Sequence, residues 1–354
     1  ELYYIDDDLY DWDRFSSFSQ LLSSHIREYA PHQLSCAYIG KVVRDLILQN
    51  FSNDTHWLDV VDQRIKATFI PRTLESEYRL LSYSLIGSHG PDLSGLNKTT
   101  LPNMIAILAD IHGNIGALQA VLNDMQTRGI EHAFVLGDIV GYGPSPNECI
   151  ELLKHTQCHI IKGNHDHAAA LGKAGSNFNK SSRWAVEWTI NELIIQHRQW
   201  LSQLPPCIKC DTFWLVHGSP MDSSFHNAYV YEKTYSKNLD FMQANGIHLC
   251  FHGHTHVTSA YIRQKYQQDR LNNRTLIEMK DSKGYFLICP GSVGLPRNDS
   301  ASAHYAIWNR DKGSLEQCSV SYDIDSVIEK MKSLDFPEYV YRLWSRLLPF
   351  KTDI

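Results

Sequence analysis

The 354-residue sequence contains no apolar run long enough to span a bilayer as a helix, which needs about 20 such residues. It also lacks an excess of positive charge, because 33 lysines and arginines stand against 39 aspartates and glutamates, for a formal net charge of −6. A protein whose main partner is a nucleic-acid backbone needs a basic face. We therefore expect neither a membrane nor a nucleic acid as a partner.

The beginning of the chain lacks the features of a secretion signal. Residues 1–8 read ELYYIDDD and contain neither a cationic segment nor an apolar core. The eight cysteines are scattered, and only Cys207 and Cys210 form a C-x-x-C pair, without the second pair that a zinc site needs. Scattered thiols are typical of a reducing compartment, so the sequence predicts a cytoplasmic protein.

The chain divides into regions that differ in pattern. Apolar residues recur at helical spacing from residue 15 to residue 47, so residues 1–86 are predicted to form a mainly helical region. Residues 87–102 are rich in glycine, serine and proline, and we interpret them as a linker. Residues 103–350 are predicted to form the main domain.

After residue 102, short apolar segments alternate with helical stripes. Residues 105–109 and 133–136 are too short for helices, and an apolar stripe over residues 117–125 lies between them. Further short apolar segments lie at residues 159–161, 213–216, 249–251 and 285–289. This alternation favours an α/β fold with a substantially parallel sheet.

Polar residues that can bind metals stand directly after five of these segments. In chain order, the five motifs are Asp110-Ile111-His112, Gly137-Asp138, Gly163-Asn164-His165-Asp166, His217-Gly218 and Gly253-His254-Thr255-His256. The carboxyl ends of strands are where α/β sheets build their active sites. Each motif alone is common in ordinary turns, but five strand ends that all carry oxygen and nitrogen donors leave little room for coincidence.

The donor atoms in these motifs indicate the kind of metal. Carboxylate, imidazole and amide oxygen groups together suit divalent ions such as Mn, Fe, Zn or Ni, and no thiolate is present to indicate structural zinc. A carboxylate that bridges two ions would hold them about 3.5–4 Å apart, the spacing of two-metal hydrolases. The sequence therefore predicts two divalent metal ions, with Mn2+ as the favoured ion.

The order D-x-H, G-D, G-N-H-D, H-G and G-H-x-H resembles the motif set of the calcineurin-like metallophosphoesterase superfamily. The resemblance extends from about residue 104 to residue 348. Within it, residues 290–297 and a closing helix expected over residues 328–347 are similar to small bacterial, phosphodiesterase-like members. The resemblance implies an α/β sandwich of two mixed β-sheets flanked by helices, with the mainly helical region as an N-terminal extension.

The resemblance also implies that seven motif residues bind metal. The ligands of the first ion would be Asp110, His112 and His256, and those of the second ion would be Asn164, His217 and His254. Asp138 would bridge the two ions. Such a pair of ions would lower the pKa of a shared water and supply hydroxide near neutral pH.

His165 is implied as the general acid that protonates the leaving oxygen. Asp166 would orient His165 and favour its imidazolium form, or it would cap a helix without a catalytic part. Three residues are weaker candidates for substrate contacts, and each has an alternative. Asn114 would contact a phosphate oxygen or form a turn, Arg297 would clamp the substrate or stay solvated, and Tyr142 would line the cleft or pack.

A departure in the second motif disfavours a phosphoprotein phosphatase. Phosphoprotein phosphatases of the superfamily carry an arginine–glycine pair shortly after this motif, whereas this chain continues Ile139-Val140-Gly141. The small bacterial members that the chain resembles are associated with hydrolysis of phosphodiesters and, in some members, of nucleotides or dinucleoside polyphosphates. The resemblance therefore implies a small-molecule substrate, either a phosphodiester or a nucleotide such as a dinucleoside polyphosphate. The alternative is a phosphoprotein phosphatase that residues 1–100 direct to a protein partner; the simpler interpretation of that region is a solvated arm and helices that pack on the main domain.

Overall fold

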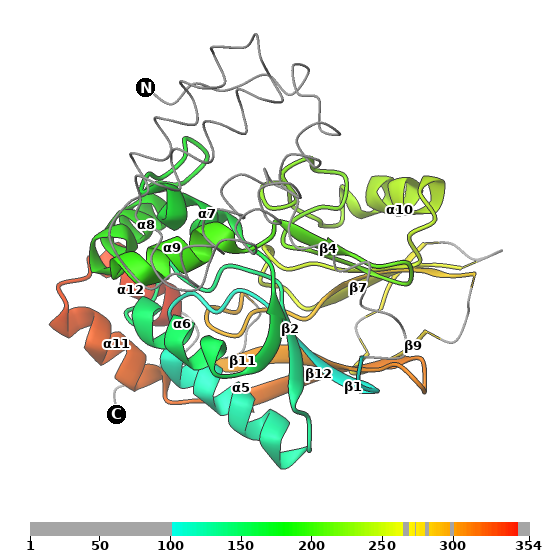
Figure 1. Cartoon of the computed structure of the whole chain (residues 1–354), viewed down its shortest axis with the longest axis horizontal. Helices are drawn as coiled ribbons and strands as arrows, with labels where there is room; N and C mark the ends of the chain where they lie inside the picture. Colours follow the sequence, from blue (N-terminus) through cyan, green and yellow to red (C-terminus); the bar gives the residue numbers. More distant parts are fainter. Residues whose placement is uncertain (1–100, 265–268, 273, 280–282, 298–300, 346–354) are drawn as a thin grey trace, which may run out of the picture. The chain divides into compact units, whose positions relative to one another are not determined.

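The computed structural model describes residues 101–345, apart from residues 265–268, 273, 280–282 and 298–300. The predicted N-terminal helical region lies outside the described residues, as does all but the end of the predicted linker, so these boundaries stay predictions. Within the described part, twelve strands form two six-stranded sheets (Figure 1). No helix among the described residues is both long enough and apolar enough to cross a membrane.

The first sheet is parallel on one side and antiparallel on the other. Its order is β3 (Gln157–Ile160), β2 (His132–Val135), β1 (Met104–Leu108), β11 (Ser302–Asn309), β12 (Ser314–Ser321) and β9 (Leu276–Glu278). Strands β3, β2 and β1 run parallel, and antiparallel pairing starts between β1 and β11, where Ala106 lies opposite Ile307. The hairpin β11–β12 extends the antiparallel side because its strands need only a short turn between them.

The second sheet is also mixed. Its order is β4 (Cys207–Lys209), β5 (Trp214–Val216), β6 (Leu249–Phe251), β10 (Tyr285–Cys289), β7 (Ser259–Arg263) and β8 (Arg270–Leu271). Only β5, β6 and β10 run parallel. The predicted sandwich of two mixed sheets is confirmed. The expectation of one substantially parallel sheet is only partly right, because the strands that apolar periodicity did not reveal pair antiparallel.

Apolar clusters lie on both faces of the first sheet, one of them between the two sheets, and the alternation of side chains along β1 shows why. Ile105 and Ile107 belong to the cluster between the sheets, together with Phe251 of the second sheet. Ala106 and Leu108 point to the opposite face and pack under helices. Strand β1 is therefore buried on both faces, as a continuously apolar strand should be.

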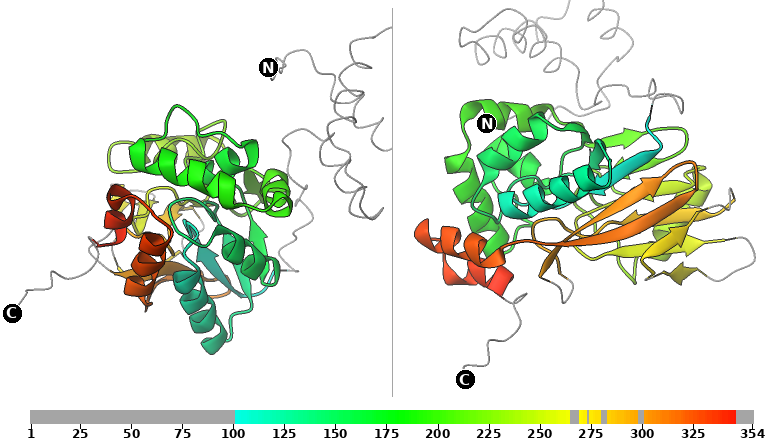
Figure 2. Two further views of the ribbon diagram at one scale, coloured as in Figure 1. Left: turned by 90° about the vertical axis from the view of Figure 1, so that its left-hand side faces the viewer. Right: turned by 90° about the horizontal axis from the view of Figure 1, so that it is seen from below.

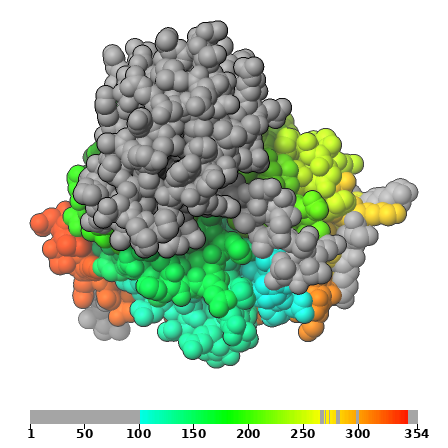
Figure 3. Space-filling model, viewed as in Figure 1, coloured from blue at the N-terminus to red at the C-terminus, as the bar shows by residue number. Residues whose placement is uncertain are grey.

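Helices cover the outer faces of both sheets. Helices α5 (Ile115–Thr127) and α6 (Pro146–Lys154) share a cluster with the outer face of the first sheet, and α10 (Tyr235–Ala244) packs on the second sheet. Helices α5 and α10 form part of the molecular surface in the space-filling view (Figure 3). Three more helices, which separate β3 from β4, are α7 (Asn164–Leu171), α8 (Lys180–Glu192) and α9 (Ile195–Gln203).

The end of the described chain forms two helices rather than the single helix predicted over residues 328–347. Helix α11 (Ile324–Ser333) and helix α12 (Glu338–Ser345) are separated by a turn in which Asp335 has a φ of 57°. Pro337 follows and disfavours helical geometry in the residue before it. The predicted continuous helix is therefore wrong, because the turn before Pro337 reverses the chain.

This turn lets the last helix reach the edge of the sandwich where the motifs lie. Helix α12 packs beside α8, as Figure 2 shows, and Trp344 is fully buried there. The indole Nε1 of Trp344 donates a hydrogen bond to the carbonyl oxygen of Gly294 at 3.0 Å. Gly294 in turn donates its N–H to the carbonyl oxygen of Asp110 at 3.0 Å. The C-terminal helices thus support the loop that follows β1.

Candidate metal centre

All five motifs lie at the carboxyl ends of strands, as the sequence predicts. The first three follow β1, β2 and β3 of the first sheet, and the last two follow β5 and β6 of the second sheet. Within each sheet these strands run parallel. The carboxyl ends of neighbouring parallel strands lie at one edge of their sheet. The motifs of both sheets lie on the same side of the sandwich, since residues from both sheets form common clusters.

The backbone of this region is strained at the predicted ligands. Positive φ angles of 50–65° occur at Asp110, His112, Asp138, His254 and His256. Such angles are uncommon for residues other than glycine and cost of order 1–3 kcal/mol each. Backbone hydrogen bonds hold the strain in place, for example from the N–H of His112 to the carbonyl oxygen of Asp138 at 2.8 Å. Strain of this kind gathers at functional sites, because it fixes where side chains point.

Glycine allows the second and third loops to approach each other. A Cβ atom on Gly163 would overlap the carboxylate of Asp138. Gly137 has a φ of 87°, and a Cβ atom there would overlap the backbone of Gly163. Only hydrogen fits at these two positions, so the glycines of the motifs are required by the contact between the loops.

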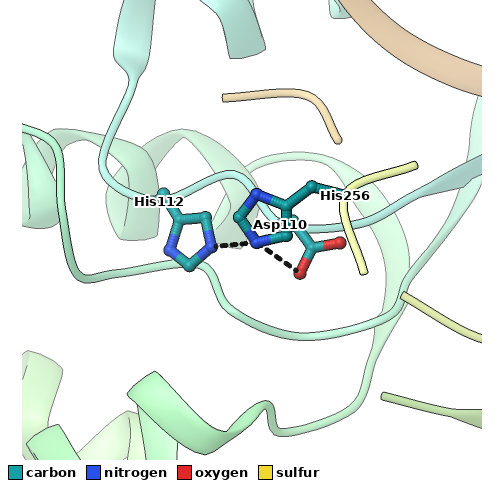
Figure 4. A group of neighbouring side chains, drawn as sticks. All are labelled: Asp110, His112 and His256. Atoms are coloured by element: carbon teal, nitrogen blue, oxygen red, sulfur yellow. Dashed lines mark hydrogen bonds and ion pairs between the residues drawn. The ribbon is translucent and has the colours of Figure 1, made fainter. Parts of the chain in front are cut away.

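A first cluster contains Asp110, His112 and His256 (Figure 4). The Nε2 atoms of the two histidines are 3.0 Å apart, and Nε2 of His256 lies 3.6 Å from Oδ1 of Asp110. The Nδ1 atoms face carbonyl oxygens, that of Val140 at 3.2 Å from His112 and that of Leu295 at 2.6 Å from His256. A carbonyl only accepts hydrogen bonds, so each Nδ1 carries the proton.

This arrangement fits a cation. Burial holds the pKa of both His112 and His256 well below the usual range, so the rings are neutral. With the proton on Nδ1, each Nε2 presents a lone pair, and the two lone pairs face each other at 3.0 Å. Lone pairs this close repel unless a positive charge lies between them. Backbone carbonyls that fix the Nδ1 tautomer are also the usual outer partners of metal-binding histidines.

A second cluster gathers around His217. Its Nε2 lies 3.2 Å from Oδ2 of Asp138, 3.1 Å from Oδ1 of Asn164 and 3.2 Å from Nδ1 of His254. Its Nδ1 donates to the carbonyl oxygen of Leu136 at 2.7 Å. Burial opposes a charge on His217, but Asp138 outweighs burial and raises the pKa of His217 to about 9. A metal that bound here would compete with this proton and release it.

Asp138 lies between the two clusters. Its Oδ2 is 3.2 Å from Nε2 of His217 in the second cluster and 3.7 Å from Nε2 of His112 in the first. Among the described residues, the groups whose donor atoms could hold a metal ion are Asp110–His112–His256, His112–Asp138–His165 and Asp138–His217–His254. Asp138 belongs to two of these groups, which is the position that a bridging ligand would occupy.

His165 is held at this centre by packing. Its ring lies edge-on to those of His112 and Phe178, with centroid separations of 4.9 and 5.0 Å. Its backbone N–H donates to Oδ1 of Asp138 at 2.8 Å, whereas its Nδ1 has no hydrogen-bond partner among the described residues. Burial lowers the pKa of His165 to about 4. The protein's own groups therefore do not favour the imidazolium form that the sequence led us to expect.

Asp166 does not orient His165. Its Oδ1 accepts hydrogen bonds from the N–H groups of Ile139 (2.9 Å) and Val140 (3.1 Å), and its Oδ2 accepts one from Gly163 (3.0 Å). The bond to Gly163 belongs to a capping box at the start of α7. The predicted pairing of Asp166 with His165 is therefore wrong, and the contacts support the alternative role at the helix terminus.

We expect replacement of Asp166 with alanine to lower the free energy of unfolding by about 2 kcal/mol. Three buried N–H groups lose their acceptor, while the cost of burying a carboxylate near Asp138 is relieved. Urea denaturation followed by circular dichroism measures the change. Asp323→Ala is the matched control, because Asp323 is an exposed N-cap with one such bond, to Ser326, and we expect about 1 kcal/mol or less. Unchanged stability together with lost activity would restore the orienting role.

A cavity of about 570 Å³ opens over the two clusters. Its wall includes His165 and four of the predicted ligands, which are Asp138, Asn164, His254 and His256. Tyr142 and Arg297 also line it. The ring of Tyr142 packs 4.9 Å from that of His112 and 4.8 Å from that of His165, so Tyr142 both lines the cavity and supports the site.

Asn114 does not reach the cavity. It is fully buried, and its Oδ1 accepts a hydrogen bond from the N–H of Ala117 at 3.1 Å as the N-cap of α5. Its Nδ2 donates to the carbonyl oxygen of Gly294 at 2.9 Å. Both polar atoms are therefore used inside the protein. The prediction of a phosphate contact is wrong, and the alternative turn role is correct.

Other cavity-lining residues had no signal in the sequence. Phe178 and Asn177 come from the loop after α7, and Tyr229 and Asn227 come from the loop after β5. The two loops meet where Nδ2 of Asn177 donates to Oδ1 of Asn227 at 3.1 Å. Neither loop follows a metal-binding motif pattern, and an aromatic or amide side chain in a loop is ordinarily a surface residue, so only the folded arrangement reveals them.

Comparisons with known proteins agree with this geometry. Residues 104–313 match the model of the calcineurin-like phosphoesterase superfamily domain. An uncharacterized protein of Methanocaldococcus jannaschii is 35% identical over 243 residues, which are 67% of this chain and 96% of that protein. A metallophosphoesterase from Sphaerobacter thermophilus superposes with a TM-score of 0.60 at 31% identity, covering 70% of this chain and 100% of its own.

A second solved structure, a hypothetical protein from Pyrococcus horikoshii, shares the fold with a TM-score of 0.55 at 22% identity, over 68% of this chain and 97% of its own. The family model alone covers more than half of the 354 residues. The chain therefore belongs to the calcineurin-like phosphoesterase superfamily, and it is a hydrolase that acts on phosphoesters.

Proposed function

We propose that the protein is a phosphodiesterase that uses two divalent metal ions, and that its hydrolase domain spans residues 103–350. The observation that carries this proposal is the convergence of imidazole and carboxylate donors in two clusters joined by Asp138. Members of the family use divalent metals. When bound, the ions would activate a water as the nucleophile and offset the negative charge of the phosphate.

We assign the ligands by the two clusters. The first ion would be bound by Asp110, His112 and His256, and the second by Asn164, His217 and His254, with Asp138 shared. Mixed oxygen and imidazole donors without thiolate suit Mn2+, with Fe, Zn and Ni as the other candidates. The carboxylate of Asp110 also accepts the N–H of His254 at 3.0 Å, so the ligand loops of the two ions are tied to one another.

His165 is the proposed general acid. It lines the cavity, and its backbone is fixed by Asp138. Since burial lowers its pKa and Asp166 does not compensate, the proton must be stabilised by the substrate. An anionic phosphate next to the ring would favour the imidazolium form. His165 would then be charged when a substrate is bound and neutral otherwise.

The cavity favours a diester of low charge over a polyphosphate. Among the described residues that line it, Arg297 is the one cationic side chain, and the others that lie outside the metal clusters are uncharged amides, hydroxyls, aromatic rings and aliphatic groups. A dinucleoside polyphosphate carries several negative charges and would call for more cations. A concave site of this volume also suits a small molecule. Nothing in the described residues favours the alternative of a phosphoprotein phosphatase, and a protein partner for residues 1–100 stays a prediction.

The direct test is hydrolysis in the presence of Mn2+ of four substrates: a chromogenic diester, the matching monoester, a dinucleoside polyphosphate and a phosphopeptide. We expect the diester to have the highest kcat/KM, and we expect chelation of the metal to abolish turnover. Addition of Mn2+ to the chelated protein should restore activity. Preference for the phosphopeptide would contradict the proposal and favour the phosphoprotein phosphatase. Turnover that survives complete metal removal would contradict the metal mechanism.

A further inference from the structure

Tyr229 stands over the second ligand cluster. Its ring stacks on that of His254, with the centroids 3.8 Å apart and an interplanar angle of 23°. The residue lines the cavity and is 45% exposed. A tyrosine with one face on a metal-site histidine and much of its surface open to a cavity is placed to contact whatever the cavity binds. Hydrophobic packing alone does not require this position, since nearly half of the residue's surface stays exposed.

Arg297 lies near this ring. Both residues line the cavity. Burial raises the pKa of the Tyr229 hydroxyl, and the positive charge of Arg297 acts on the hydroxyl with a smaller, opposite effect. The backbone N–H of Arg297 donates to the carbonyl oxygen of His256 at 3.1 Å. An aromatic face and a cation are therefore held side by side at the cavity. A planar group and an adjacent phosphate would meet both at once.

The loop that carries Tyr229 is held in one conformation by Asp222. The carboxylate accepts hydrogen bonds from the N–H and hydroxyl of Ser224, at 3.0 and 2.7 Å, and from the N–H groups of Asn227 and Ala228, both at 2.9 Å. Tyr229 is the next residue in the chain after Ala228. Because the loop is ordered before binding, little conformational entropy is lost when a ligand stacks on the Tyr229 ring. A loop of this kind is suited to ligand recognition.

Different residues of the cavity wall pack against His165. Phe178 packs edge-on against His165, and the neighbouring lining residues Asn179, Ser181 and Ser182 are small and uncharged. His165, as the proposed acid, must face the leaving oxygen. Tyr229 stacks on His254 and not on His165, so we assign it to the group that stays attached to phosphorus.

We propose that Tyr229 determines substrate specificity by stacking on a nucleobase in the retained half of a phosphodiester, with Arg297 on the phosphate. This inference rests on the proposed phosphodiesterase function. Stacking of a base on an aromatic side chain is favourable for every base, because each has a π-face. The protein should therefore prefer nucleoside esters over alkyl esters, with weak discrimination among the bases.

Two chromogenic diesters with the same leaving group test the proposal. They are the p-nitrophenyl ester of thymidine 5′-phosphate and methyl p-nitrophenyl phosphate, assayed with the Mn2+-loaded full chain. We expect the wild type to prefer the nucleoside ester, and we expect Tyr229→Ala to lower this preference about 10-fold, mainly through KM. Tyr229→Phe should keep most of the preference, because it retains the ring. Tyr231→Ala is the matched control, since Tyr231 is 47% exposed in the same loop but does not line the cavity.

A binding measurement separates this inference from the proposed function. Fluorescent ethenoadenosine monophosphate should be quenched on binding to the wild type and much less by Tyr229→Ala. Quenching that depends on Tyr229, in a protein that hydrolyses neither diester, would refute the phosphodiesterase and leave the stacking site standing. An equal loss of kcat/KM for both diesters in Tyr229→Ala, or a fall in bound metal, would show that Tyr229 only supports His254 and would overturn the inference. So would a preference that Tyr229→Ala leaves unchanged.

Discussion

Asp138→Asn is expected to lower kcat/KM for a diester by about 10³-fold or more, because charge stabilisation by a bound metal contributes several kcal/mol to the transition state. The carboxylate lies between the clusters, with Oδ2 at 3.2 Å from His217 and 3.7 Å from His112. Asparagine keeps the size of the side chain but loses the charge and one of the two oxygens. Neither cluster then retains its shared ligand.

The effect should appear in metal content as well as in rate. Isothermal titration with Mn2+, supported by elemental analysis, should show two ions per chain in the wild type and fewer in Asp138→Asn. Asp323→Asn is the control, because Asp323 is an exposed N-cap on α11, distant in sequence from the motifs. If Asp138→Asn binds two ions with wild-type affinity, Asp138 is not the bridging ligand, whatever happens to the rate.

The clustering of the candidate metal ligands was predictable because the ends of strands can be recognised from local sequence. A short apolar segment predicts a strand, and a glycine beside an aspartate or histidine marks where the strand ends. Parallel pairing of β1, β2 and β3 then brings Asp110, Asp138 and Asn164 to one edge. Strands that pair antiparallel, such as β11 and β12, escaped prediction, since polar residues such as His304 in β11 and Gln317 in β12 interrupt their apolar pattern.

The wrong pairing of Asp166 with His165 has a geometric cause. Asp166 follows His165 directly in the sequence, which suggested that the two side chains act together. Both lie in the first turn of α7, where consecutive residues point in different directions. Asp166 therefore turns back to the loop that follows β2, while His165 turns into the cavity. The N–H groups at the start of a helix and in a tight loop have no backbone partner, so they bind the Asp166 carboxylate in preference to the His165 ring.

The cavity wall could not be predicted for a different reason. Its loop residues are positioned by tertiary contacts such as the hydrogen bond between Asn177 and Asn227, which lie 50 residues apart. Nothing in the local sequence distinguishes Tyr229, which stacks on His254, from Tyr231, which does not line the cavity. The proposed substrate contacts of this chain therefore lie in loops, whereas its proposed metal ligands lie at strand ends.

His165→Ala is expected to lower kcat by about 10²–10⁴-fold for a diester with an alkoxide leaving group, the usual contribution of a general acid. The same variant should lose only about 10-fold or less with a p-nitrophenyl ester, because p-nitrophenolate leaves without a proton and the acid contributes little there. His165 lines the cavity, and neither its backbone bond to Asp138 nor the metal ligands depend on the imidazole. Bound Mn2+ should therefore stay at the wild-type level.

The comparison of the two leaving groups distinguishes acid catalysis from a supporting role. His167→Ala is the matched control, since His167 lies on the same helix, is only partly buried and does not line the cavity. If His165→Ala loses both activities equally while metal content is unchanged, the imidazole acts on the phosphate and not on the leaving oxygen. If metal content falls with the rate, His165 belongs to the group that it forms with His112 and Asp138, and the assignment of seven ligands is incomplete. His165 is the general acid only if the loss of kcat in His165→Ala increases with the basicity of the leaving group. A more basic leaving group depends more strongly on a donated proton.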